Sequence, residues 1–395
     1  METLVIPRTQ TEMLELMPKH QRLFIGVPKE TTLQENRVAL VPHSVMTLTA
    51  QGHRVVVEAG AGDKAKFSDH DYSEAGAEVA SSPEEVFKAD VLLKVAPPTL
   101  PEIDLMRPNQ VLISPIHLPL ISAEYITRLQ KKRVIALAME YIRDDDTGMF
   151  PVVHIMSEIA GINAILIAAD LLNNTRGGKG VLLGGIAGVP PAKVIILGAG
   201  VVAEFATRTA LGLGAEVRIF DNNVYKLMRL QNRVGRQLHT SVINPRHLNE
   251  QLVTADVAIG AMHSAQGRTP LIVGEDIICK MQPGSVIVDV SIDQGGCFET
   301  SKATTHENPT YVVDGVVHYC VANMPGAVPR TSTVALNNAT LPFVIALANQ
   351  GYKEAMRRNH HLLNGLNVCH GKITYQAVAE ALQQPYTPAE QVIGG

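Results

Sequence analysis

The sequence predicts an α/β fold made of two doubly wound domains. Apolar runs of strand length alternate with helical patterns from Phe24 onward, which is typical of a parallel sheet with helices on its faces. A Gly/Pro-rich loop at 174–193 interrupts this alternation, and a second set of strand and helix patterns follows it. At 395 residues the chain is long enough for two domains that each bury a sizeable core.

Five apolar runs predict the strands of the first domain, at 23–27, 53–60, 90–95, 110–116 and 133–142. Helical patterns lie between them, at 42–52, 84–89 and 122–132. A charged segment marked by Gly and Pro, 143–151, indicates a domain boundary. We therefore expect the first domain to begin at residue 23 and to reach residue 150.

A long helix is predicted to connect the domains. Ser157 is a good N-cap, and the pattern from there to residue 174 is apolar nearly all round, so the helix should be buried on several sides. We expect the second domain at 151–331, with strands at 194–200, 216–220, 256–262, 285–291 and 310–320. Another long apolar helix, 332–348, could return to the first domain, which would then be discontinuous, 23–150 plus 332–395.

Composition excludes several classes of protein. Hydrophobic residues make up 46% and charged residues 18% of the chain, which indicates a globular protein rather than a disordered one. The formal charge of -4 offers no basic field for nucleic acid. The four cysteines show no CxxC spacing, which argues against a metal site or a disulfide framework and favours a reducing compartment: Cys279, Cys297, Cys320 and Cys369.

The first 22 residues are expected to be an N-terminal extension, 1–22. Thr9 and Glu12 have capping-box spacing, so a short helix is predicted there. The segment carries acids and lacks a basic region before a long apolar core, so it is not a signal peptide. The best membrane-span candidate, 181–203, contains two prolines and a lysine. We expect no membrane span and a cytoplasmic protein.

The strongest local signal follows the first strand of the second domain. Gly198, Gly200 and Ala203 fit the pattern G-x-G-x-x-G/A, directly after an apolar run and before a helix. The first glycine permits a tight turn, the second lets the backbone approach a pyrophosphate, and the alanine allows close helix–strand packing. Asp221 ends the next strand, where it can accept a hydrogen bond from a ribose hydroxyl. This combination predicts a Rossmann-type dinucleotide site rather than an ordinary Gly-rich turn.

The residues around this site favour NAD over NADP. The carboxylate of Asp221 would repel a 2′-phosphate, and no arginine adjoins it in sequence. Lys226 follows closely and is expected to lie along the adenosine ribose. We therefore predict NAD as the cofactor.

Three side chains of the first domain stand where a parallel sheet binds ligands. Arg37 follows a strand and a polar loop, where it could form a fork with a carboxylate. Lys94 and His117 each end an apolar run, at the sheet edge that faces ligands in α/β proteins. Taken singly, each of the three is better explained as a surface, rim or core residue.

Two aspartates mark the run 285–291. Asp289 lies within it and Asp293 just beyond it, where a carboxylate without a partner is costly. We expect Asp289 to be structural and to accept hydrogen bonds from backbone donors. Asp293 should lie just past the carboxyl end of its strand, at the crevice where the nicotinamide end of a dinucleotide would lie. The glycines at 295 and 296 should let this loop pass close to the cofactor.

Motifs along the chain resemble those of the bacterial L-alanine dehydrogenase family. The resemblance covers about residues 24–385 in order, through IGVPKETTLQENRVAL, AGAG, LLKV, MSEIAG, GKGVLLGG, ILGAG, DVSIDQGGCFE and YCVANMPGAVPRTST. The superfamily also contains the nucleotide-binding subunit of proton-translocating transhydrogenase. The resemblance implies a Rossmann-like substrate domain with an NAD domain inserted into it, assembly into a hexamer, and NAD-dependent oxidative deamination of L-alanine to pyruvate and ammonia.

The resemblance also implies roles for individual residues. Arg37 and Lys94 would bind the carboxylate and carbonyl of the substrate. His117 would be the acid/base, which suits the ordinary pKa of histidine, and Asp293 a second catalytic residue facing the nicotinamide. Three more residues would line the cofactor: Ser157, Asn323 and Met324.

Two departures from the family pattern bear on the substrate pocket. Ser114, Pro115 and Ile116 replace an aromatic-rich segment before the histidine, and His154 stands where apolar residues and proline are usual. A related amino-acid or opine-type dehydrogenase is therefore one alternative. Others are a transhydrogenase-like subunit, whose loop typically reads EQGGN where this chain has DQGGCFE, and a non-catalytic NAD-binding protein.

Overall fold

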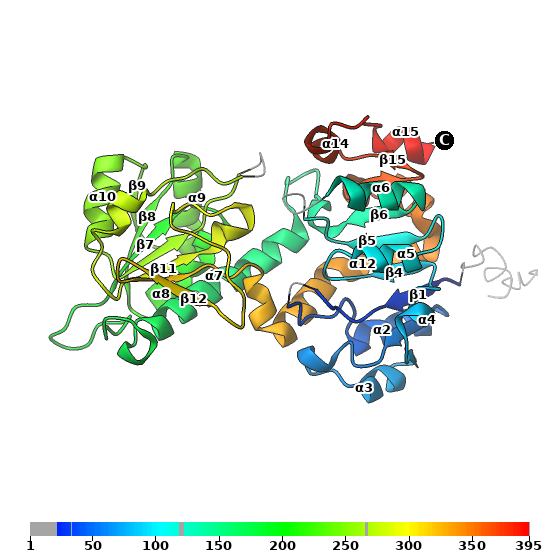
Figure 1. Cartoon of the computed structure of the whole chain (residues 1–395), viewed down its shortest axis with the longest axis horizontal. Coiled ribbons are helices and arrows are strands. Elements are labelled where there is room, and N and C mark those ends of the chain that lie inside the picture. The colour runs from blue at the N-terminus through cyan, green and yellow to red at the C-terminus, as the bar shows by residue number, and fades with distance from the viewer. Residues whose placement is uncertain (1–21, 33, 118–121, 265–267, 395) are drawn as a thin grey trace, which may run out of the picture.

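The computed structural model describes residues 22–32, 34–117, 122–264 and 268–394. The helix predicted within residues 1–22 lies outside these ranges. Figure 1 shows two lobes, each built around a sheet, with the lobe that carries β1 and β4 on one side and the lobe that carries β7 and β11 on the other.

The first sheet contains most of the N-terminal third of the chain. Its strands, within the described ranges, are β1 (Phe24–Val27), β2 (Arg54–Glu58), β3 (Glu78–Ala80), β4 (Val91–Leu93), β5 (Val111–Ser114), β6 (Ile135–Ala138), β14 (Leu366–Cys369) and β15 (Lys372–Ile373). They are ordered β15-β14-β6-β5-β4-β1-β2-β3. Strands β1 to β6 are parallel, whereas β14 joins β6 in the antiparallel sense.

The second sheet repeats this order. Its strands are β7 (Lys193–Leu197), β8 (Glu216–Phe220), β9 (His239–Ser241), β10 (Val257–Gly260), β11 (Val286–Asp289), β12 (Thr310–Val313) and β13 (Val316–Tyr319), ordered β12-β13-β11-β10-β7-β8-β9. In both sheets the first six parallel strands follow the order 3-2-1-4-5-6 of dinucleotide-binding folds. The predicted fold of two doubly wound α/β domains is confirmed.

Helices cover both faces of each sheet. The first lobe carries α2 (Pro42–Ala50), α3 (Asp69–Glu74), α4 (Pro83–Val86), α5 (Leu100–Leu105), α6 (Ala123–Lys131), α13 (His360–Asn364), α14 (Gln376–Leu382) and α15 (Ala389–Gly394), and the second carries α8 (Val201–Gly212), α9 (Val224–Val234), α10 (Pro245–Val253) and α11 (Glu275–Ile278). Successive strand residues enter opposite cores, as Leu92 and Leu93 do. This alternation explains why the strands read as unbroken apolar runs.

Two long helices join the lobes: α7 (Pro151–Leu171) and α12 (Pro329–Arg358). The prediction that Ser157 caps α7 is wrong, because the helix begins at Pro151 and Ser157 lies in its second turn. Proline is favoured at the first helical position, where its missing N–H would have no partner. Helix α12 is interrupted at Gly351, whose φ of 73° is not helical.

Both connecting helices have the length and apolar composition of membrane spans, and 44% of the apolar window of each is buried inside the molecule. Helix α7 packs against α8 and α12. Central helices of water-soluble proteins have the same composition, because they are buried on several sides.

Candidate active site

The site lies where the carboxyl ends of the two sheets meet the linking segments. In the first sheet, neighbouring strands β1, β4, β5 and β6 are followed by Arg37, Lys94, His117 and Glu140 respectively. Ligands of α/β sheets bind at this edge, next to the point where the strand order reverses. Here that point lies between β1 and β4.

The glycine loop of the second lobe fits a dinucleotide. Gly198 has φ +110°, and a Cβ there would lie 2.3 Å from the carbonyl oxygen of Ala261. No described atom lies within 4 Å of a Cβ built on Gly200, which leaves the backbone approachable. No described side chain caps the N-terminus of α8, so its first N–H groups can donate to a pyrophosphate. Ala203 is fully buried against the sheet.

Asp221 sits beside this loop at the end of β8. Its Oδ2 accepts from the N–H of Ala199 at 2.8 Å and its Oδ1 from the N–H of Asn223 at 2.7 Å. A carboxylate has about four lone-pair positions, so it can still accept from a ribose hydroxyl. Lys226 follows on α9, and its charge, together with burial, lowers the pKa of His263 after β10. These residues surround the edge where the adenosine half would lie.

Arg37 is held by contacts from both lobes. Its Nε and Nη2 donate to Glu35 at 2.7 Å, and Nη2 also donates to Oδ1 of Asn323 at 2.8 Å. Asn323 in turn donates to Glu35 at 3.0 Å, and Nη1 of Arg37 contacts the sulfur of Met156 at 3.1 Å. The Arg37 side chain thus makes four contacts with described residues, and because a guanidinium has five N–H donors, one is left for a ligand.

Lys94 is buried between two carboxylates. It is 1% exposed, and its Nζ lies 2.9 Å from Glu30 and 3.1 Å from Glu102. Burial lowers the pKa of Lys94, but the two carboxylates outweigh this effect and raise it. The ammonium therefore stays charged, and among the described residues its third N–H has no acceptor, which leaves it for a ligand.

His117 and Asp293 share the electrostatic influence of Arg37. The His117 side chain is exposed, yet the protein atoms around it lower its pKa, and Arg37 lowers it further while Glu35 opposes. Asp293 lies in the 3₁₀ turn η5 (Val290–Gln294). Asp293 is exposed, yet the protein atoms around its carboxyl group desolvate it and raise its pKa to about 6, against the backbone N–H of Asn323 and the charge of Arg37, which lower it. Asp293 can therefore titrate close to the working pH range of an enzyme, whereas the lowered pKa of His117 keeps its imidazole neutral at pH 7.

Asp289 has the structural role that its position predicts. Its carboxylate is buried and accepts from the N–H groups of Ser291, Cys297 and Phe298 and from the hydroxyl of Ser301. It fixes the turn that presents Asp293. The two following glycines, 295 and 296, have φ of +95° and +79°, which a side chain would disfavour.

The three residues expected to line the cofactor differ in their surroundings. Asn323 has φ 62° and directs its side chain to Glu35 and Arg37, and Met324, which begins η6 (Met324–Ala327), is buried. Ser157 follows Met156 on α7. His154 lies in the first turn of α7, where its Nε2 is 3.1 Å from Glu158.

The sequence reasoning missed several charged residues: Glu30, Glu35, Glu140 and His263. The signal for Glu140 was present, because it follows an apolar run at the same sheet edge as Lys94 and His117. Glu30 and Glu35 lie in the loop after β1, and nothing in the sequence shows which cations they contact.

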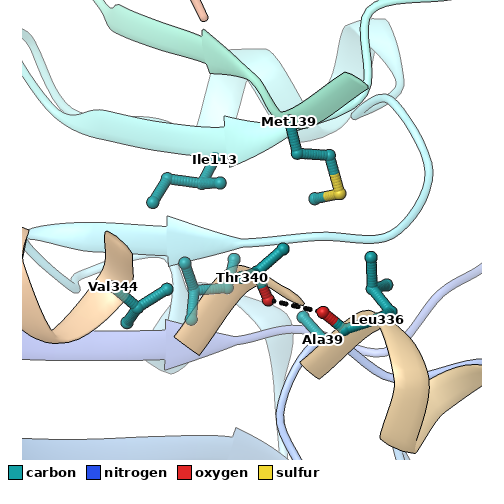
Figure 2. Close-up of a pocket in the computed structure, with 7 residues that line it drawn as sticks. Ala39, Ile113, Met139, Leu336, Thr340 and Val344 are labelled. Carbon is teal, nitrogen blue, oxygen red and sulfur yellow. Dashed lines mark hydrogen bonds between the residues drawn. The ribbon is translucent and has the colours of Figure 1, made fainter. Parts of the chain in front are cut away.

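Two small cavities of the first lobe differ in character. One has a volume of about 10 Å³ and is lined mostly by apolar side chains from the sheet, from α12 and from the segments that follow β1 and β6. Figure 2 shows the residues that line it: Ala39, Leu93, Ile113, Met139, Leu336, Thr340 and Val344. The Thr340 hydroxyl turns to the carbonyl of Leu336 in its own helix, at 3.0 Å. It offers no polar anchor to a substrate. The other, of similar volume, adjoins Arg37, Glu35 and Glu30.

Two sheets of the same strand order, one edge shaped for a dinucleotide and the other carrying charged groups, place the protein among the two-lobed dinucleotide-dependent oxidoreductases. Known proteins define the group further. The alanine dehydrogenase/PNT N-terminal domain matches residues 26–160 and the corresponding C-terminal domain matches residues 164–376. The chain belongs to the alanine dehydrogenase/PNT family.

Individual relatives agree with this assignment. The chain is 44% identical to alanine dehydrogenase of Methanococcus maripaludis, over 94% of this chain and 100% of the relative, and 45% identical to that of Halomonas elongata, over 94% and 100%. A solved L-alanine dehydrogenase matches with a TM-score of 0.87 and 43% identity, over 91% of this chain and 99% of that one. A transhydrogenase from Sinorhizobium meliloti matches with a TM-score of 0.76 and 26% identity, over 90% and 99%.

Proposed function

We propose that this chain is an NAD-dependent L-alanine dehydrogenase, which interconverts L-alanine with pyruvate and ammonia. The observation that carries the proposal is that the charge of Arg37 acts on both His117 and Asp293, in a chain whose second lobe carries a glycine loop fitted to a dinucleotide. Oxidation of an amino acid requires a cation for its carboxylate, a group that moves protons, and an anion near the positive charge that develops on nitrogen.

Arg37 and Lys94 bind the substrate in this proposal. The remaining N–H of Arg37 receives the carboxylate, and the remaining N–H of Lys94 receives the carbonyl oxygen of pyruvate. Glu35 and Glu30 hold the two cations at fixed positions. Two fixed cations orient the small substrate so that its Cα–H bond faces the nicotinamide, which lowers the entropic part of the barrier.

His117 and Asp293 move and balance charge. NAD, when bound, accepts the hydride that leaves Cα, and a cationic iminium remains on the substrate. Asp293, ionised above about pH 6, faces this cation. His117, whose pKa is lowered, is neutral at pH 7 and removes a proton from the water that attacks the iminium carbon. It then returns the proton to the amine as ammonia leaves.

The two lobes divide the work in this proposal. Residues 23–150 and 332–395 form the substrate domain, and residues 151–331 form the inserted NAD domain. The return of β14 to the first sheet, beside β6, supports the discontinuous substrate domain. Three residues of the inserted NAD domain face the nicotinamide half of the cofactor: Ser157, Asn323 and Met324.

A homohexamer in the cytoplasm completes the proposal. Exposed apolar side chains on one loop of the NAD lobe support self-association: Leu182 is 67%, Ile186 64% and Val189 56% exposed. Changing Ile186 to Asp should reduce the molar mass measured by light scattering, whereas a hexamer that survives this change would place the interface elsewhere.

The test is oxidation of NADH by purified protein with pyruvate and ammonium, compared with glyoxylate, 2-oxobutyrate and NADPH. We expect turnover that requires ammonium and prefers pyruvate and NADH. Faster turnover with a larger 2-oxo acid would keep the reaction class and replace alanine. Tight NADH binding without turnover would contradict the proposal and favour a transhydrogenase-like or non-catalytic protein.

A further inference from the structure

The buried carboxyl of Glu140 has no role in the reaction proposed above, yet it contacts the segment that carries His117. Its Oε1 accepts from the N–H of Ile116 at 2.7 Å and from the N–H of His117 at 3.0 Å. Successive backbone N–H groups aimed at one oxygen form an anion-binding nest. Here the anion is a side chain from the neighbouring strand, because Glu140 follows β6 and His117 follows β5.

The backbone at His117 needs such support. Its φ is +50°, in the left-handed region that residues with a Cβ disfavour. A residue persists in this conformation when its surroundings fix it, and such residues concentrate at functional sites. The two hydrogen bonds from Glu140 act directly on the peptide groups that set this angle.

Stability alone does not explain Glu140. Its Oε2 is buried and has no hydrogen-bond partner among the described residues. Burial raises the pKa of Glu140 to about 7, against the two N–H groups, which lower it. A buried acceptor without a partner is costly, and an apolar residue of similar size would avoid that cost.

The groups facing Glu140 do not neutralise it. Tyr125 on α6, Tyr141 on the adjacent turn and Tyr375 before α14 each interact electrostatically with it. All three are phenols whose pKa is raised by burial, so they stay neutral at pH 7 and offer no positive charge. Tyr141 and Tyr375 stack with their ring centroids 4.3 Å apart.

We propose that Glu140 is a positioning residue for His117: its Oε1 fixes the backbone of Ile116 and His117 and thereby aims the imidazole at the substrate. This inference rests on the proposed acid/base role of His117. The same contact involves the segment Ser114-Pro115-Ile116, which differs from the family pattern, because this segment ends at the peptide groups that Glu140 binds.

Three substitutions of Glu140 distinguish the effect of its hydrogen-bond acceptor from the effects of its charge and its volume. Glu140→Gln keeps an oxygen that can accept both bonds, Glu140→Met fills the space without an acceptor, and Glu140→Asp keeps the charge with a shorter reach. We expect Met and Asp to lower kcat for reductive amination by about 10²-fold, the size of effect caused by misplacing a reacting group by about 1 Å. NADH affinity and the KM for pyruvate should stay unchanged, and Gln should recover most of the kcat.

Two controls show whether the effect passes through His117. In the double variant Glu140→Met/His117→Ala, the losses should not add, since the glutamate acts through the histidine. The matched variant Glu78→Met, on an exposed glutamate paired with Arg54, should behave as wild type. Additive losses, or wild-type kcat in both Glu140→Met and Glu140→Asp, would overturn the inference.

A measurement without turnover keeps the inference separate from the proposed function. The ring resonance of His117, assigned by its loss in His117→Ala, should shift or broaden in Glu140→Met and stay in place in Glu140→Gln. An unmoved resonance in a folded Glu140→Met protein overturns the positioning role even if the enzyme is active. A moved resonance in a protein whose His117→Ala variant is fully active would keep the positioning and remove the acid/base role.

Discussion

The two lobes share one strand order but equip the same sheet edge in different ways. The edge of the NAD lobe presents backbone: a glycine with φ +110°, a second glycine with open space beside it, and a helix N-terminus without a side-chain cap among the described residues. The edge of the substrate lobe presents side chains, each held by a carboxylate: Arg37 by Glu35, Lys94 by Glu30 and Glu102, and the His117 backbone by Glu140. Binding a large cofactor needs an approachable surface, whereas reaction of a small substrate needs charged groups held at fixed positions.

The largest effect should come from the substrate lobe. His117→Ala removes the proposed acid/base, which contributes about 10²–10⁴-fold to rate, so kcat should fall by that amount. NADH affinity, measured by fluorescence titration, should not change, because the glycine loop lies in the other lobe. Turnover that survives the change would show that this edge does not supply the acid/base.

The two glycines of the NAD lobe should respond differently to alanine. At Gly198 a Cβ would collide with a backbone carbonyl at positive φ, so Gly198→Ala should cost about 1–3 kcal/mol of unfolding free energy as well as NADH affinity. At Gly200, with φ −84° and open space, alanine should leave stability intact and weaken NADH binding at least about tenfold. Denaturant unfolding and NADH titration together check both. Equal loss of stability in the two variants would contradict the comparison.

The two sheet edges could be predicted from the sequence to different extents, because one is built from backbone and the other from side chains. The backbone site depends on a local pattern, so Gly198, Gly200, Ala203 and Asp221 could be proposed from spacing alone. Glu35 lies two residues from Arg37 in the same loop, so the local sequence could have suggested that pair. Glu30 and Glu140 could not be matched with their partners, because those contacts join different loops. Glu30 reaches Lys94 across 64 residues, and Glu140 reaches the His117 backbone across 23. Only the order of the strands brings them together.

The strands, too, were only partly predicted from the sequence. Most central strands are buried on both faces and read as apolar runs, whereas β3 and β9 lie at sheet edges and were not predicted. Both are short, and β9, His239–Ser241, is polar and largely exposed. The C-terminal strands β14 and β15 were not predicted either, although β14 is buried. Helix α7 was expected at Ser157 because a serine N-cap is a strong local signal, but Pro151 at the end of a charged loop begins it instead.

The pH dependence of the reaction rate should show that ionisable groups from both lobes contribute to the reaction. Desolvation raises the pKa of Asp293 to about 6, so the carboxylate is lost as pH falls through 6, and the pKa of His117 is lowered from its ordinary value. The rate of alanine oxidation, as kcat/KM, should therefore fall about tenfold per pH unit below about pH 6. In Asp293→Asn the rate should be lower at pH 8 and should keep only the His117 limb. An unchanged acid limb in that variant would exclude Asp293 from the reaction.

The smallest effect should follow loss of a side chain from the NAD lobe. Lys226 on α9 is exposed, and exposed charges contribute at most about 1 kcal/mol, so Lys226→Ala should weaken NADH binding no more than about fivefold. Its positive charge lowers the pKa of His263, and removing it should therefore raise that pKa toward the ordinary value. An NMR titration of His263 measures this shift, with Lys280→Ala on the same lobe as the matched control. If Lys226→Ala abolished NADH binding, a side chain rather than backbone would dominate this edge, and the contrast between the two lobes would fail.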